Sequence, residues 1–132
     1  MNLHLVLNPI EPAPLSIKHS QGLGLDLSLL LKNPDGSPVD PDTVNPVLHL
    51  RARSDAKVLT FKLETYDSTN GITSTHIDGG WLQDPHGYQL EVFSTVPAED
   101  PEGAPVPQRM IASGRLALKM SAYAQGMGAM VV

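Results

Sequence analysis

The acidic stretch NPDGSPVDPDT, residues 33–43, carries side chains that could bind a metal ion. Asp35, Asp40 and Asp42 supply carboxylate oxygens of the kind that calcium prefers. Their spacing does not match a calcium loop, in which acids alternate and a glutamate follows, and three prolines stiffen the backbone. Asn-Pro-Asp-Gly instead fits a type I turn, with proline second and glycine where φ can be positive. The stretch therefore predicts a turn between two strands.

A second candidate for metal chemistry is the stretch HIDGGWLQDPHGY, which begins at His76. His76, Asp78, Asp84 and His86 are ligand types that suit zinc or a similar ion. Against this, the first two share one face of an expected strand, whereas the other two lie in a proline turn. We predict no metal and no cofactor, and a metal-dependent enzyme at His76, Asp78 and His86 remains the weakest of three functional hypotheses.

The same stretch contains Trp81, the single tryptophan of the chain. An aromatic face beside two glycines can stack on a sugar ring while the ring edges hydrogen-bond. The alternative function is therefore a carbohydrate-binding β-sandwich module that uses Trp81 and Tyr88. A lone tryptophan at the corner of a sheet is more typical of a core or an interface.

Nucleophilic and general acid–base catalysis find little support in the sequence. No strand–turn–helix motif of the G-x-S-x-G kind occurs, and ASGRL looks like an irregular piece of strand, with a bulge expected near Ser113-Gly114. The acidic pair Glu99-Asp100 falls in a proline-rich segment where solvent would leave its pKa values untuned. We predict that the protein is not an enzyme.

Composition narrows the remaining classes of protein. The chain of 132 residues is the usual size of one domain, and it has no cysteine to form a disulfide. Fourteen acids against nine lysines and arginines give a net charge of -5 and no basic stripe, which disfavours nucleic acid. No secretory leader and no apolar run of ~20 residues is present, so no membrane partner is expected. Twelve prolines and eleven glycines disfavour helix.

Short alternating strands dominate the chain. In GLGLDLSLLL the odd-numbered leucines from Leu23 to Leu31 share one face, and "LHLRAR" places Leu50 inward with Arg51 and Arg53 outward. Turn signals separate seven or eight such strands, which predicts an all-β, antiparallel, immunoglobulin-like β-sandwich. We divide the chain into an N-terminal strand or arm at 1–14, a sandwich at 15–121 and an apolar C-terminal tail at 122–132.

The order of these motifs carries a family resemblance. DGSPVD, the NGI turn, GYQLEVF and ASGRLALK, spread over about residues 17 to 121, make the chain similar to the immunoglobulin-like domain of phage baseplate upper proteins and related small phage tail and head accessory proteins. This resemblance implies a non-enzymatic virion part that holds other parts in place. The chain departs from that family by its proline-rich leader, its apolar tail and the lack of a fibre-forming continuation, which puts a receptor-binding role in doubt.

The expected function is therefore that of a structural protein of a tailed bacteriophage virion, made in the host cytoplasm. It would self-associate as a trimer or ring and fasten onto capsid or tail proteins, as a capsid cement or decoration protein or as a tail or baseplate adaptor. Exposed strand edges and apolar ends are what such contacts use. The predicted interface residues lie at the two ends of the chain and in a loop from residue 97 to 107: Leu3, Leu5, Pro97, Pro105, Met127, Met130 and Val131.

Overall fold

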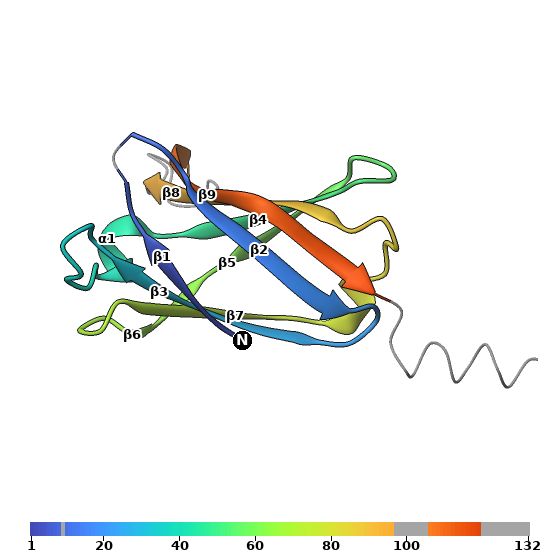
Figure 1. Cartoon of the computed structure of the whole chain (residues 1–132), viewed down its shortest axis with the longest axis horizontal. Coiled ribbons are helices and arrows are strands. Elements are labelled where there is room, and N and C mark those ends of the chain that lie inside the picture. The colour runs from blue at the N-terminus through green and yellow to red at the C-terminus, as the bar shows by residue number, and fades with distance from the viewer. Residues whose placement is uncertain (9, 97–105, 120–132) are drawn as a thin grey trace, which may run out of the picture.

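Two β-sheets stacked face to face make up the described part of the protein (Figure 1). The coordinates are a computed structural model, and it describes residues 1–8, 10–96 and 106–119. One sheet has four strands in the order β1-β3-β7-β6, and the other has five in the order β2-β9-β8-β4-β5. The prediction of an all-β sandwich is thereby confirmed.

The nine strands are numbered in the order in which they follow one another along the chain. Their bounds are β1 Asn2–Val6, β2 Ala13–Ser20, β3 Leu25–Lys32, β4 Val47–Ala52, β5 Val58–Lys62, β6 Glu64–Asp67, β7 Ile72–Ile77, β8 Tyr88–Val96 and β9 Val106–Lys119. The helix α1 at Pro41–Val44 and the 3-10 turn η1 at Gly79–Trp81 are the helical pieces of the described residues. The described residues thus form nine strands, and not the predicted seven or eight.

Leucines on alternating positions fill the space between the sheets. In β3, Leu25, Leu27, Leu29 and Leu31 are all buried, as their period of two requires. Leu23, which the alternation placed on the same face, lies before the strand and is 44% exposed. The facing sheet contributes Leu15, Ile17, Leu48, Leu50, Leu90, Val92 and Leu116.

Two pairings differ from a purely antiparallel sandwich. β1 runs parallel to β3, and β2 runs parallel to β9 with Ala13 opposite Ala112 and Ser20 opposite Lys119. The N-terminal strand therefore lies in a sheet of its own chain. Leu5 is fully buried there and Leu3 packs against the core.

The segment from Val58 to Asp67 reads as one alternating strand in the sequence, but the structure divides it at Leu63. Residues before Leu63 belong to the five-stranded sheet, and residues after it belong to the four-stranded sheet. Leu63 is buried at the crossing, where its amide donates to the carbonyl of Pro46 at 3.1 Å. The crossing ties the two sheets together at one end of the sandwich.

Candidate functional site: the outer face of the five-stranded sheet

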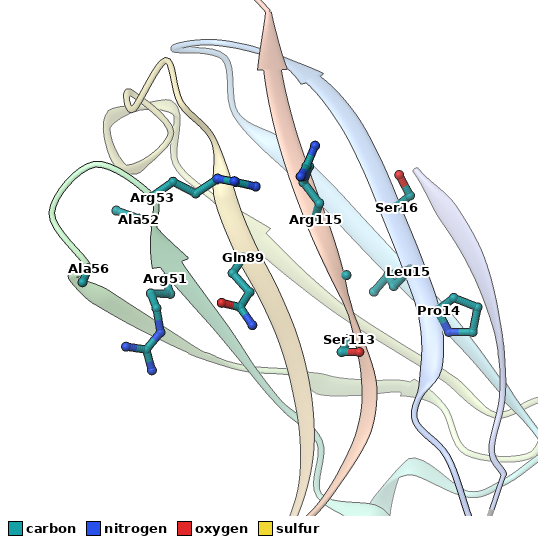
Figure 2. A pocket seen from close by; sticks show the side chains of 11 residues that line it. Pro14, Leu15, Ser16, Arg51, Ala52, Arg53, Ala56, Gln89, Ser113 and Arg115 are labelled. Atoms are coloured by element: carbon teal, nitrogen blue, oxygen red, sulfur yellow. The ribbon is translucent and has the colours of Figure 1, made fainter.

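Three arginines stand on the outer face of the five-stranded sheet (Figure 2). Arg51 is in β4, Arg53 follows directly after β4, and Arg115 is in β9. Each occupies a position that alternates with buried neighbours, such as Ala52 and Leu116, so its side chain must point to solvent. We call these three residues the arginine cluster.

Strand register places the cluster around one glutamine. Gln89 in β8 is paired with Arg51 on one side and with Arg115 on the other, and Arg115 is paired with Ser16 of β2. Neighbouring strands lie about 5 Å apart, so Arg51 and Arg115 are separated by about 10 Å across Gln89. This spacing avoids placing two like charges directly opposite each other, an arrangement that destabilises a strand pair.

The cluster lines an open depression of ≈ 920 Å³. In Figure 2 the Gln89 amide lies between Arg51 and Arg115, and Ser16 and Ser113 line the depression on the side of β2 and β9. Within the described residues, the ion pairs are those of His76, and no carboxylate lies within ion-pair distance of the cluster. Guanidinium forks bind carboxylates through two parallel hydrogen bonds. The guanidinium groups around the depression can therefore form such hydrogen bonds to an anionic group.

Charge is distributed very unevenly between this sheet and the rest of the chain. The five strands carry six lysines and arginines and one acid, Glu91, for a formal charge of +5. The remaining residues of the sequence carry the other three cations and thirteen acids, for a formal charge of -10. The net charge of the chain thus conceals a basic sheet, and the expectation that no basic stripe exists is wrong for this face.

On the outer face of the four-stranded sheet, one histidine is paired with two carboxylates. His76 Nδ1 lies 2.6 Å from Asp26 Oδ1, and His76 Nε2 lies 3.1 Å from Asp78 Oδ1. The hydrogen bond to Asp26, followed by the attraction of both carboxylates, raises the pKa of the His76 imidazole above 6.5. The imidazolium form donates a hydrogen bond to each of the two acids. The bond to Asp26 links β7 to β3 at the protein surface.

The two other members of the predicted metal site lie in a different group. The Asp84 carboxylate accepts from the Ser54 hydroxyl and from the His86 amide, and the bond from Ser54 lowers the Asp84 pKa below 3.8. Throughout the three described ranges, no group of three or more histidine and acidic side chains has an arrangement that could hold a metal ion. The structure does not bring the four predicted ligands together.

The predicted aspartate turn is confirmed in detail. The Gly36 amide donates to the Asn33 carbonyl at 2.9 Å, and Asp35 Oδ1 accepts from the Ser37 amide and hydroxyl at 2.9 and 2.6 Å. Asp40 caps α1 by accepting from the Asp42 amide, and Asp42 accepts from the Thr65 hydroxyl. These carboxylates are occupied by the turn, the helix cap and a contact to β6.

Trp81 is exposed and Tyr88 is not. The indole of Trp81 is 54% exposed and lines a pocket of ≈ 590 Å³ together with Gln83 and Lys57. Tyr88 is buried, and its hydroxyl donates to the Trp81 carbonyl at 2.7 Å. Tyr88 therefore supports the backbone of the Trp81 loop, and the predicted stacking pair is reduced to Trp81.

Most of the predicted interface residues fall outside the described part of the chain. Those five are Pro97, Pro105, Met127, Met130 and Val131. Leu3 and Leu5 are described, and they pack into the core of their own chain. The exposed side chains of β1 are Asn2, His4 and Val6. The use of the chain ends as contacts stays a prediction.

Comparison with known proteins gives a fold and no family. No family model matches the chain, and no curated protein matches it in sequence. Among solved structures, the chain is similar to the "N-terminal domain of phage TP901-1 ORF48", with a TM-score of 0.59 and 14% identity. The likeness covers 90% of this chain and 99% of that one. The two share a fold over nearly their whole lengths.

Among the described residues, no helix is both long enough and apolar enough to cross a membrane.

Proposed function

We propose that the protein is a non-enzymatic structural component of a tailed bacteriophage particle, which associates with other copies of itself and fastens onto capsid or tail proteins. The observation that carries this proposal is the match between the whole sandwich and the N-terminal domain of a phage protein. The motif order of the sequence supports the same assignment. A capsid cement or decoration role and a tail or baseplate adaptor role both fit this proposal.

The arginine cluster has no ion-pair partner among the described residues, and this supports a function at a surface. His76, in contrast, is paired with two carboxylates of its own chain. Arg51, Arg53 and Arg115 remain available for charge-assisted hydrogen bonds to another molecule. A structural component of a particle works through such contacts.

The test is the protein content of particles purified from the phage that encodes the chain. We expect the protein to co-purify with particles at many copies each and to be visible on the head or the tail after gold labelling. Particles that lack the protein, while the lysate contains it, would contradict the proposal. The labelled position distinguishes decoration of the head from a ring on the tail.

A second candidate function is carbohydrate binding, because the exposed Trp81 lines a pocket that also holds Gln83, Asp84 and His86. Since Trp81 is the single tryptophan, its fluorescence reports this pocket directly. Titration with a panel of oligosaccharides should quench or shift the emission if a sugar stacks on the indole. No change in emission with any glycan of the panel, or equal binding by Trp81→Ala, would remove this candidate.

A further inference from the structure

We propose that the arginine cluster is the docking site for the acidic end of a second copy of this chain, so that copies associate head to tail. This inference rests on the proposed function and deepens it, because it names the surfaces through which copies of a particle protein meet. The argument comes from the position and pairing of charged groups in the described residues.

The acidic end consists of five carboxylates around α1 and β6. They are Asp35, Asp40, Asp42, Glu64 and Asp67. The hydrogen bond from Thr65 to Asp42, at 2.6 Å, joins the helix to the strand and holds these residues at one end of the sandwich. Lys32 and Lys62 also lie at this end, but the carboxylates remain in excess.

The arginine cluster and the acidic end lie at opposite ends of the molecule. β4 begins three residues after α1 and runs away from it, and Arg51 and Arg53 are at the far end of that strand (Figure 1). Strand β4 spans six residues at about 3.3 Å each, so the two surfaces of one copy are separated by about 15 to 20 Å. The chain cannot neutralise its own cluster with its own acidic end.

A second copy has the complementary charge that the cluster lacks. Complementary potentials on two surfaces guide association and set the orientation of the partners. Contact between unlike surfaces of identical chains is heterologous, and such contacts produce closed rings or open filaments. The predicted ring is one of these two outcomes.

The proposed contact is electrostatic and should therefore depend on salt. At about 0.05 M salt the purified protein should self-associate, whereas about 0.5 M salt, where screening acts within a few ångströms, should dissociate it. Light scattering during gel filtration gives the mass of the particles in each buffer. A monomer at low salt and high protein concentration would overturn the proposal.

Reversing the charge on each surface separately tests which residues meet. We expect the variant R51E/R115E to weaken self-association by about 100-fold, because it opposes acid to acid. The variant D42R/E64R should weaken it similarly, because it opposes cation to cation. Lys32→Glu reverses a charge at the acidic end but adds an acid there, so it keeps the attraction to the arginine cluster; it is the control and should not weaken association. Equal losses in all three variants would place the contact elsewhere.

Mixing the two variants gives the decisive result. The acidic end of R51E/R115E can bind the arginine cluster of D42R/E64R, and the two reversed surfaces attract each other as well. An equimolar mixture should therefore recover association, as alternating copies of the two variants, although each variant alone is monomeric. No recovery in the mixture would overturn docking between copies, even if R51E/R115E bound a nucleic acid or another particle protein less well.

Two further measurements keep the test independent of folding and of the proposed function. Circular dichroism and the melting temperature show whether each variant is folded, and Glu64→Arg alone replaces the pair if D42R/E64R is not. Self-association of pure protein is measured without particles. If the protein incorporates into particles but stays monomeric in solution, only the docking inference is contradicted. If the protein self-associates but is absent from particles, only the proposed function is contradicted.

Discussion

The two outer faces of the sandwich use their charged residues in opposite ways. On the four-stranded sheet, His76 is held between Asp26 and Asp78, so its charge stabilises the chain that carries it. On the five-stranded sheet, the arginine cluster has no carboxylate within ion-pair distance among the described residues. His76 is thus paired within its own chain, whereas the three arginines can form charge-assisted hydrogen bonds to a partner. Loss of the His76 pairs should therefore affect folding, whereas substitution of the arginines should affect association.

The largest effect on stability is expected at Gly114, a glycine in the five-stranded sheet that carries the arginine cluster. Gly114 lies opposite Leu15, and a Cβ added to it would come within 1.6 Å of the Leu15 carbonyl oxygen. Gly114→Ala must push β2 away from β9, and overpacking of this kind lowers the free energy of unfolding by about 2 to 3 kcal/mol. Chemical denaturation measures the loss. Gly80→Ala, whose added Cβ meets nothing within 4 Å, is the control; an equal loss there would show that Gly114 is not special.

A smaller effect is expected from the buried hydroxyl of the four-stranded sheet. Thr73 is fully buried and its hydroxyl donates to the Glu64 carbonyl at 2.8 Å. Thr73→Val keeps the shape but leaves that acceptor without its donor, which should lower the free energy of unfolding by about 1 kcal/mol. Thermal unfolding at low protein concentration measures the change. An unchanged melting temperature would mean that solvent replaces the hydroxyl.

Neutral substitution in the arginine cluster should separate folding from association. Arg51→Gln removes a charge that has no ion-pair partner among the described residues, so the free energy of unfolding should change by less than about 0.5 kcal/mol. The same variant should weaken self-association. If Arg51→Gln unfolds the protein instead, the cluster has a structural role and the contrast between the faces is lost.

The smallest effect is expected at the exposed His76, and it depends on pH. Its pKa is raised in the folded protein, so its contribution to stability is complete below pH 6.5 and is lost as pH rises through the folded pKa. Asp26→Asn should return the pKa of His76 toward 6.5, and Asp78→Asn should shift it less, because the bond to Asp26 is the main cause. An NMR titration of the imidazole C–H signals measures both shifts. Equal shifts in the two variants would contradict this order.

Strand alternation in the sequence was sufficient to predict the sandwich and much of its core. The odd-numbered leucines from Leu25 to Leu31, together with Leu48, Leu50 and Ala52, face inward as their period of two requires. The bulge expected near Ser113-Gly114 lies instead close to Ile111 and Gln108, where the pairing with β8 shifts register. The crossing at Leu63 was missed because an unbroken alternation does not show that a strand changes sheets.

The arginine cluster could be predicted only in part. The LRAR pattern places Arg51 and Arg53 outward, which the sequence shows directly. That Gln89 and Arg115 stand beside them depends on the order of strands in the sheet, which joins residues far apart in the chain. The composition argued against a basic surface, because acids outnumber lysines and arginines in the whole chain. The fold gathers most of the cations on one sheet, and the composition does not show this.

The parallel pair of β2 and β9 has a consequence for synthesis of the protein. It joins residues about 100 positions apart, so closing this pair carries a large loss of chain entropy and tends to slow folding. During translation, β2 has no strand to pair with in its sheet until β9 has emerged from the ribosome. Arg115 arrives on that same strand. A nascent chain therefore displays Arg51 and Arg53 without their third member, and the arginine cluster is complete only after nearly the whole sandwich has been made.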